Sequence, residues 1–399
     1  MPKTQACQKY IRALHYFQFL MAFVLLIFLY NFLPIHKNAT ETFYIEGLNA
    51  QSVENALKEN GYTLTFVDKM MLSLDTLPET GWYSLEKHRY GRYAFFKNIY
   101  KHKAKTMNIV IYAAETHAEI IARLANDMKL EVKELQKAYK VFTPFKEASI
   151  FSGHYKVARK VKEETLMRYL LKDSEKVLDF FIAKSFINPP DRLEVKILLT
   201  IASIIQKESN AIDEMPIISA VIYNRLKKKM KLQMDSTLNY GEFSHTIVTP
   251  ERIKSDTSYY NTYKHKGLPP YPLASISIEA LRAAMFPEDC KHLFFMLKPS
   301  GKHVFCESYE EHLTNIRTFR EYQKKREEEK KKLAEKKLAD EKIAEEKKKK
   351  EALAIKEKKA KTLKEKTKQE KIIKDKAVKE SNVTKEHNTS NDSNDSNVS

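Results

Sequence analysis

Residues 198–241 read LLTIASIIQKESNAIDEMPIISAVIYNRLKKKMKLQMDSTLNYG, and they contain the strongest structural signal in the chain. Its first part continues an apolar run that begins at Leu193, which predicts a helix over 193–207 at the centre of a core. A second helix is expected over about 214–228, with Asp213 as its N-cap and Pro216 in its first turn. Strands and helices alternate irregularly on both sides of this stretch, so the fold class is expected to be α+β.

Glu208 comes directly after this helical run. On a helix it shares a face with Ile201, Ile204 and Ile205. An acid on that line is partly desolvated, which raises its pKa and keeps its proton on near neutral pH. Such a carboxyl is suited to act as a general acid. The alternative is a glutamate at the end of a helix that simply reaches solvent.

Further polar groups follow Glu208 closely. Asn224 falls on the apolar side of the second helix, where a buried amide needs hydrogen-bond partners, for structure or for function. Residues 233–237 read QMDST and could form a turn and helix cap, with Asp235 or Ser236 as the N-cap. Arg225 and the lysines after it form either a solvated face or a cationic patch suited to anionic carboxylates.

An apolar segment over 13–33 is long enough to cross a bilayer as a helix. Tyr16 and Tyr30 suit the two membrane interfaces, and three basic residues lie between positions 3 and 12. We therefore expect residues 1–12 in the cytoplasm, an anchor over 13–33, and the rest of the chain outside the cytoplasm. The alternative is a cleaved signal peptide, although no A-x-A-like site follows the apolar run.

The net charge of +18 over 399 residues raises nucleic acid as a partner. Half of that excess lies in 321–380, which holds 24 basic and 15 acidic side chains. Because this segment is expected on the far side of the membrane from the genome, we expect no nucleic-acid partner. Residues 323–399 are expected to form a solvated tail, either a single charged helix or disordered. An attraction to anionic wall polymers or lipid head groups is the alternative.

The region 41–145 contains two small patterns. The first has a strand over 42–46, a helix over 50–58 and a second strand over 63–67. The second begins with a strand over 108–112, continues with the capping box Thr116-x-x-Glu119 and its helix, and adds a helix over 132–139. Strand, helix, helix resembles the start of a LysM-type module, which binds glycans, although many α+β domains begin this way.

The region 146–322 is expected to be one further domain. Beyond the central helices it contains an amphipathic helix over 163–184, an aromatic and Pro-rich loop over 259–272, and a short helix over 277–285. A hairpin over 292–305 and a helix over 309–322 complete it. The hairpin register sets Cys290 and Cys306 off-opposite, so we expect no disulfide between them.

Seven motifs in order give the chain a family resemblance. They are Glu208-Ser209, Asn224-Arg225-Leu226, 232–241, 260–263, 267–270, 303–305 and His312. Over 193–319 the chain resembles the endolytic murein transglycosylases of the YceG-like (MltG) family. The resemblance weakens towards the N-terminus, although an anchor, a LysM-like module and a catalytic domain follow one another in the family's order.

The resemblance implies that Glu208 is the catalytic acid. The expected reaction cleaves the β-1,4 bond between N-acetylmuramic acid and N-acetylglucosamine within a glycan strand and leaves a 1,6-anhydro end. No metal and no cofactor are expected. Implied partners are peptidoglycan strands, the inner membrane and possible peptidoglycan synthases. The implied substrate-binding residues are Asn224, Gln233, Asp235, Thr237, Tyr240, Tyr260, Asn261 and Tyr263.

The chain departs from the family pattern at three places. Gln206 replaces an acidic residue, Ser236 replaces the proline of D-P-T, and Tyr271 replaces the glycine of P-P-G. Without the acidic neighbour, desolvation must keep the proton on Glu208. Two rival functions are a hydrolase of the same bond, with Asp235 or Glu214 activating water, and a non-catalytic wall-binding scaffold.

Overall fold

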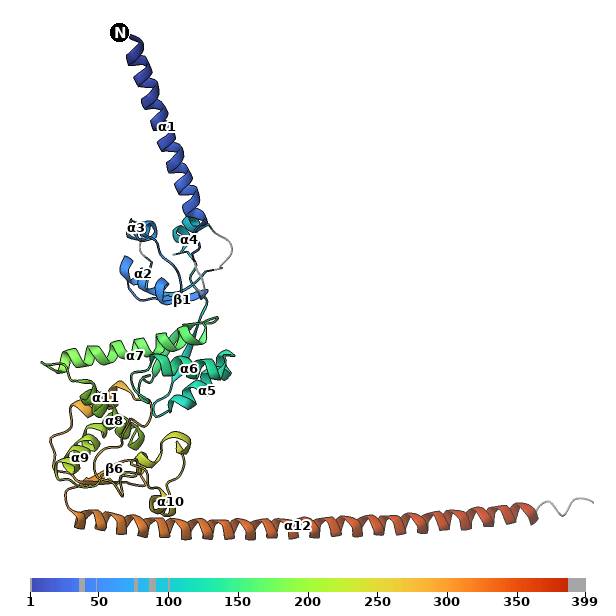
Figure 1. The fold of residues 1–399 in the computed structure, drawn as a ribbon. Helices are drawn as coiled ribbons and strands as arrows, with labels where there is room; N and C mark the ends of the chain where they lie inside the picture. Colours follow the sequence, from blue (N-terminus) through green and yellow to red (C-terminus); the bar gives the residue numbers. More distant parts are fainter. Residues whose placement is uncertain are drawn as a thin grey trace, which may run out of the picture. The chain divides into compact units, whose positions relative to one another are not determined.

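The computed structural model describes residues 2–35, 40–47, 49–74, 78–85, 91–99 and 101–386 (Figure 1). It is α+β, as predicted, with three two-stranded antiparallel sheets among the described residues. The chain divides into two compact units, Met1–His312 and Leu313–Ser399. Three separate apolar cores lie within the first unit.

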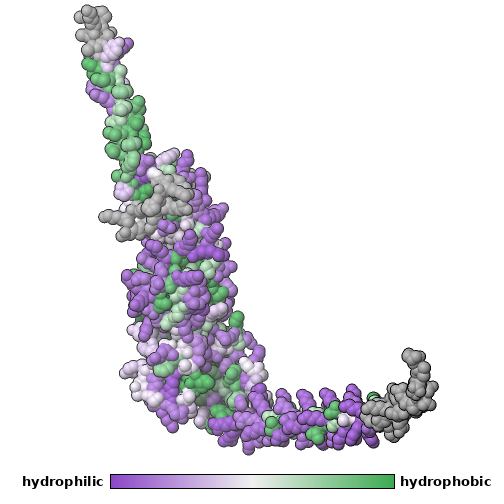
Figure 2. Space-filling view, turned by 90° about the vertical axis from the view of Figure 1, so that its right-hand side faces the viewer, coloured by the Kyte–Doolittle hydropathy of each residue, from purple (hydrophilic) through white to green (hydrophobic). Residues whose placement is uncertain are grey.

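Helix α1 (Pro2–Phe32) opens the first unit. Its part Gln8–Phe32 is long and apolar enough to cross a membrane. Figure 2 shows an apolar surface along this helix. The expected apolar segment is therefore helical, and its length and composition are compatible with a single-pass anchor.

The first small module follows α1. It contains β1 (Thr42–Ile45), α2 (Ala50–Glu59), α3 (Phe66–Leu74), β2 (Gly81–Ser84) and α4 (Arg92–Asn98). Its core includes Phe43, Ile45 and Phe96. The predicted strand over 63–67 is wrong. The Asp68 carboxylate accepts hydrogen bonds from the backbone N–H and hydroxyl of Thr65, which starts helix α3, and β2 pairs with β1 instead.

The second module has the order strand, helix, helix, strand. These elements are β3 (Thr106–Ile111), α5 (His117–Met128), α6 (Val132–Phe142) and β4 (Gly153–Ala158). The capping box of Thr116 and Glu119 is present as predicted. Helix α7 (Glu163–Ser185) packs against α6. The LysM-like assignment of this module stays a prediction.

The third core is built around α8 (Arg192–Glu208). This helix packs against α9 (Met215–Lys227) and α11 (Ile278–Met285). Ile201, Ile204 and Ile205 are fully buried, and each stabilises the fold by about 1.5–3 kcal/mol through burial. The isoleucine face read from the sequence is thus the centre of this core.

The start of α9 differs from the prediction. Glu214, not Asp213, occupies its N-cap position. Asp213 is exposed and pairs with Lys302, with 3.3 Å between Oδ2 and Nζ. The Glu214 side chain turns to His303 instead, so a tertiary contact replaces the expected local cap.

Short elements connect these helices. They are two 3₁₀ turns, η1 (Asp235–Leu238) and η2 (Gly241–Phe243), the helix α10 (Pro250–Ser255), and the hairpin of β5 (Phe294–Leu297) and β6 (His303–Cys306). Met234 occupies the N-cap position of η1, so the expected cap by Asp235 or Ser236 is wrong. Cys306 lies opposite Phe294 in the hairpin, and Cys290 and Cys306 are both thiols in this structure.

Backbone hydrogen bonds join the second module to the third core. The Ala114 N–H donates to the Ser275 carbonyl at 3.0 Å, and the Ser275 N–H donates to the Glu115 carbonyl at 2.7 Å. The Ser152 N–H donates to the Ile276 carbonyl at 2.8 Å. The segment before α11 is therefore held by the second module.

Helix α12 (Tyr309–Glu386) begins in the first unit and continues through the second. The expected helix over 309–322 is its start. The tail is helical through Glu386, and its described side chains from 323 onward are exposed. Residues 387–399 lie outside the described part of the chain.

Candidate active site

Glu208 is the last residue of α8, and Ser209 is its C-cap. The Ser236 N–H in η1 donates to Glu208 Oε1 at 3.3 Å. The Glu208 side chain keeps part of its surface open, while protein atoms surround its carboxyl closely. The helix therefore ends at this acid, yet the acid does not simply extend into solvent.

The pKa of Glu208 is raised above its ordinary value. Burial is the main cause, and the negative charge of Asp235 adds to it. The interaction with Ser236 and the charge of His303 oppose the increase without cancelling it. The position of Glu208 agrees with the desolvation expected from the isoleucine face, and a carboxyl with a raised pKa keeps its proton to a higher pH than a free one does.

Asp235 and Tyr263 lie beside this acid. The Tyr263 hydroxyl donates to Asp235 Oδ1 at 2.7 Å. Burial raises the pKa of Tyr263, and the charges of Asp235 and Glu208 raise it further. Three predicted residues therefore meet in one cluster, in which Asp235 is exposed and carries a negative charge next to Glu208.

Thr237 holds the turn that carries Ser236. Its side chain is fully buried, and its hydroxyl donates to the Met234 carbonyl at 2.7 Å and lies 2.9 Å from Thr262 Oγ1. The expectation that Thr237 binds substrate is therefore not met by its position. Its role is to fix η1 against the loop that contains Thr262.

Asn261 is likewise structural. It is 0% exposed, and its amide nitrogen donates to the carbonyls of Ile253 and Asp256, both at 2.8 Å. Its side-chain oxygen accepts the Tyr263 N–H at 3.1 Å. Asn261 was expected to contact substrate, but its hydrogen-bonding groups are used inside the loop that positions Tyr263.

Tyr240 and Tyr260 stack on one another. Their ring centroids are 3.8 Å apart with an interplanar angle of 11°, and the Tyr240 hydroxyl donates to Ser258 Oγ at 3.1 Å. Burial raises the pKa of Tyr260 to about 12. One face of each ring is therefore covered by the other. Both rings also pack against the third core, so each is only partly open to a sugar.

Asn224 and Arg225 fasten α9 to the segment just before β5. The Asn224 amide donates to the carbonyls of Cys290 and His292, at 2.8 and 3.1 Å. Arg225 is buried and donates to the Leu293 carbonyl at 2.6 Å. Asn224 was expected at the substrate and Arg225 at the surface, but both hold backbone in place.

Glu214 and His303 form a buried pair that the sequence did not assign. His303 Nδ1 lies 2.6 Å from Glu214 Oε2, and the His303 N–H donates to Glu214 Oε1 at 2.8 Å. The Ser209 hydroxyl also donates to Glu214, at 3.2 Å. Burial alone would raise the pKa of Glu214, but the contacts with His303 outweigh it and hold this pKa below its usual value. The sequence signal that could have pointed to this pair is His303 itself, because it lies in one of the family motifs.

The two departures near Glu208 have structural explanations. Gln206 is buried, and its side-chain oxygen accepts the Ser277 N–H at the start of α11, at 3.0 Å. The Ser236 hydroxyl is buried beside Glu208 and, among the described residues, completes no well-formed hydrogen bond.

Gln233, the remaining residue expected at the substrate, is exposed and has a positive φ of 49°. Within the described part of the chain, no three His, Cys, Asp or Glu side chains gather in a way that could hold a metal ion.

Comparison with known proteins assigns the family. The YceG-like family model matches residues 44–318, and the chain belongs to this family. An endolytic murein transglycosylase of Bacillus subtilis (strain 168) is 33% identical over 149 residues, which are 37% of this chain and 41% of that protein. One of Streptococcus pneumoniae (strain ATCC BAA-255 / R6) is 29% identical over 193 residues, 47% of this chain and 34% of that protein.

These matches span less than half the length of either relative. Among solved structures, a YceG-like protein from Listeria monocytogenes is similar at 24% identity with a TM-score of 0.45. That match covers 68% of this chain and 98% of the Listeria chain.

Proposed function

We propose that this chain is a membrane-anchored endolytic lytic transglycosylase of peptidoglycan. It would cleave the β-1,4 bond between N-acetylmuramic acid and N-acetylglucosamine in nascent strands and so terminate their elongation. The observation that carries the proposal is the state of Glu208, a desolvated acid with a raised pKa at the end of a core helix. The family and the names of its relatives supply the substrate class.

One carboxyl suffices for the reaction. Protonated Glu208 gives its proton to the glycosidic oxygen as the C1–O bond breaks, and N-acetylglucosamine leaves with a free hydroxyl. The Glu208 carboxylate then takes the proton of the muramyl C6 hydroxyl, whose oxygen bonds to C1. The product has a 1,6-anhydro end, the acid has regained its proton, and no water is consumed.

The residues around Glu208 would serve the two halves of this cycle. The Ser236 N–H stabilises the carboxylate after the proton has left, while burial and Asp235 favour its return. Asp235, Tyr263 and Gln233 are the side chains placed to orient sugar and amide groups. Tyr240 and Tyr260 present their remaining ring faces for stacking on sugars.

The remaining parts of the chain fit this role. Helix α1 would anchor the protein in the inner membrane, with residues 1–12 in the cytoplasm and the catalytic domain over 146–322 in the periplasm. The region 41–145 would include a LysM-like module that binds the same glycan. Peptidoglycan synthases, which make the substrate strands, are the expected neighbours.

Hydrolysis of the same bond is the second candidate, because Asp235 supplies a carboxylate beside Glu208. Glu214, the other carboxylate considered for this role, is occupied by His303 and Ser209. The products separate the two reactions: a lyase leaves anhydro ends and a hydrolase leaves reducing ends.

The test uses the full chain in detergent micelles on isolated glycan strands, with mass spectrometry of the fragments. We expect internal cleavage with anhydro ends, and a loss of about 10²–10⁴-fold in rate for Glu208→Gln. Glu279→Gln, at an exposed glutamate on α11, is the matched control and should cleave at the wild-type rate. Full activity of a folded Glu208→Gln variant would refute the catalytic role of Glu208. An inactive wild-type protein would favour the alternative in which the chain is a non-catalytic wall-binding scaffold.

A further inference from the structure

Helix α3 has an exposed apolar stripe. Phe66 and Leu74 are 80% and 79% exposed, and Met70 lies between them at the same four-residue spacing. Val67 borders this stripe, so four large apolar side chains share about 100° of the helix surface. Asp68 and Leu72 face the core on the other side. Most of the stripe's surface, at Phe66 and Leu74 above all, is therefore left uncovered by its own module.

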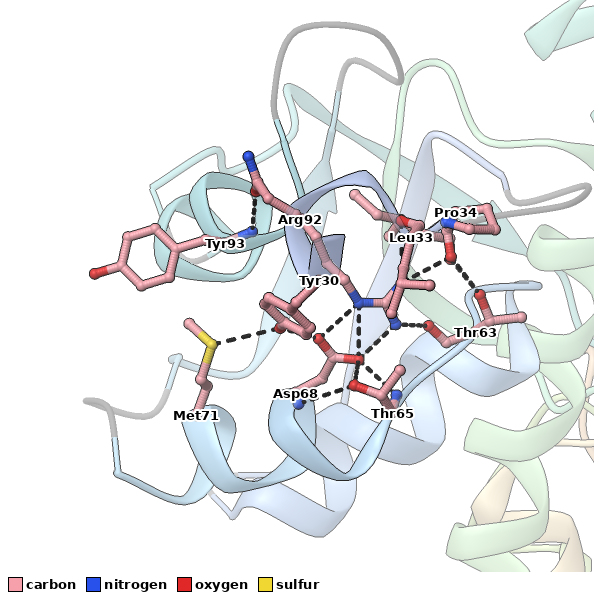
Figure 3. A network of polar contacts seen from close by, with 11 residues as sticks. Tyr30, Leu33, Pro34, Thr63, Thr65, Asp68, Met71, Arg92 and Tyr93 are labelled. Atoms are coloured by element: carbon pink, nitrogen blue, oxygen red, sulfur yellow. Dashed lines mark hydrogen bonds and ion pairs between the residues drawn. The ribbon is translucent and has the colours of Figure 1, made fainter. Parts of the chain in front are cut away.

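Helix α3 contacts the last turn of α1, as Figure 3 shows. The Tyr30 hydroxyl donates to Asp68 Oδ1 at 2.5 Å and lies 3.6 Å from the sulfur of Met71. Since Gln8–Phe32 is the candidate membrane span, Tyr30 lies within its final turn. Helix α3 is thus attached to the end of the span by direct side-chain contacts.

Arg92 adds further hydrogen bonds to this attachment (Figure 3). It is 1% exposed and donates to Asp68, to the Pro34 carbonyl at 2.7 Å and to the Thr63 carbonyl at 2.8 Å. Because Pro34 lies only two residues beyond the end of α1, one guanidinium joins the end of the anchor, the chain before α3 and the carboxylate within α3. A flexible hinge at this junction would break that network.

Helix α4 adds a second tie and a polar flank. The Tyr93 N–H donates to Asn31 Oδ1 at 3.1 Å, and a Cβ at Gly91 would come within 2.5 Å of the Asn31 amide. Tyr93 is exposed, and Lys97 lies one turn on with its Nζ 5.8 Å from the Tyr93 ring centroid. Exposed tyrosine and lysine side chains are typical of the head-group region of a bilayer.

We propose that α3 rests on the surface of the membrane that α1 crosses, with Phe66, Met70 and Leu74 inserted among the lipid head groups and upper acyl chains. This inference rests on the anchor in the proposed function. Because Tyr30 lies in the last turn of the span, the side chains it contacts lie at the depth of the membrane interface. A helix with one apolar face at that depth buries it about 5–10 Å into the boundary layer. The occupant is lipid, since Asp68 and Met71 of the same helix contact the last turn of the segment that would already be embedded.

Tryptophan fluorescence of the full chain in phosphatidylcholine–phosphatidylglycerol vesicles tests this directly. The chain has one tryptophan, Trp82, which is buried and gives a constant background. Phe66→Trp and Leu74→Trp place a reporter on the stripe, and Lys137→Trp places one on the exposed face of α6 as the matched control. The readouts are quenching by brominated lipid and quenching by iodide in water.

We expect roughly threefold stronger quenching by brominated lipid for Phe66→Trp and Leu74→Trp than for Lys137→Trp, and the reverse order for iodide, because only the stripe would lie in the interfacial layer. If the vesicles carry the protein but the stripe reporters behave like the control, the inference is wrong and the stripe binds something other than lipid. Flotation of the vesicles in a density gradient shows whether the protein is bound to them. If the protein does not float with the vesicles, the anchor proposal fails, and this inference fails with it.

Discussion

The junction at the end of α1 and the site at the end of α8 each enclose a carboxyl group. The junction stabilises the ionised form of its carboxyl group, whereas the site favours the protonated form. Asp68 is 0% exposed and accepts hydrogen bonds from Arg92, Tyr30 and Thr65. Burial opposes its ionisation, but these bonds outweigh the burial and hold its pKa below the usual value. Glu208 has one long bond from the Ser236 N–H, and its pKa is raised.

The difference separates a structural carboxylate from one poised for chemistry. A buried charge with many donors is fixed in place and cannot give up a proton it does not hold. A carboxyl with too few donors keeps its proton and can transfer it, at some cost in stability once it ionises. Breaking the ion pair of Asp68 should therefore lower the stability of the protein, whereas neutralising Glu208 should raise it.

The largest effect is expected at the junction. Arg92→Ala leaves Asp68 buried without its cation, which should destabilise the first module by about 3–5 kcal/mol. Hydrogen exchange of the β1–α4 amides in the full chain measures this. The double variant Arg92→Met with Asp68→Leu should recover most of the loss, because no unpaired charge remains. Lys103→Ala, which removes an exposed ion pair with Glu79, is the control and should leave the exchange rates unchanged. If Lys103→Ala and Arg92→Ala lost protection equally, the buried pair of Arg92 would have no special role.

Glu208→Gln should change stability with the opposite sign. The folded protein raises the pKa of Glu208 above its ordinary 4.5, so ionisation costs stability as pH rises from 4.5 through the raised value. The variant lacks this cost and should unfold at a higher temperature than wild type above that range. The two proteins should converge as pH falls below 4.5, where both side chains are neutral. A variant that is less stable than wild type at alkaline pH would contradict the comparison.

A smaller effect is expected on the pH dependence of cleavage. Because the acid must hold its proton, kcat/KM should fall as pH rises through the raised pKa of Glu208. Ser236→Ala removes a hydroxyl that favours the ionised form, so the fall should move to higher pH, with a change of about fivefold or less on the plateau. Ser255→Ala, at an exposed serine, is the control. An unmoved or lowered profile would show that Ser236 does not act through Glu208.

The smallest effect is expected from the tail. Truncation after Tyr322 should leave cleavage of short soluble glycans unchanged, because the described side chains beyond it are exposed and mostly charged. Binding to intact wall sacculi should weaken, and this difference should shrink as salt rises, since exposed charges are screened beyond about 8–10 Å. Turnover of the two proteins on one short glycan is the measurement. A tenfold loss would place the tail in the catalytic machinery.

Local patterns predicted the elements that depend on local chemistry. The isoleucine face of α8, the capping box at Thr116 and the apolar helix α1 all follow from side-chain spacing along one segment. The strand expected over 63–67 failed because the contact between Thr65 and Asp68 favours a helix start. That contact is itself local, so the capping pattern T-x-x-D was the missed signal.

The roles of the polar side chains were harder to predict. Asn224, Thr237 and Asn261 lie in the motifs of the candidate site, yet their hydrogen-bonding groups are used to hold backbone. The pair of Glu214 and His303 was not assigned, because its members are far apart in the sequence. A residue's position within a motif does not tell whether it faces the substrate or supports a neighbour that does.

The helical core with an acid at its end, the apolar first helix, the charged tail and the family could all be read from the sequence. Each of these follows from periodicity, composition or motif order within continuous segments. Three features became visible only in the folded chain: Asp235 and Tyr263 join Glu208, Asn261 turns inward, and Arg92 ties the end of α1 to Asp68. A polar side chain takes its role from the donors, acceptors and burial around it, and folding brings these from distant parts of the chain.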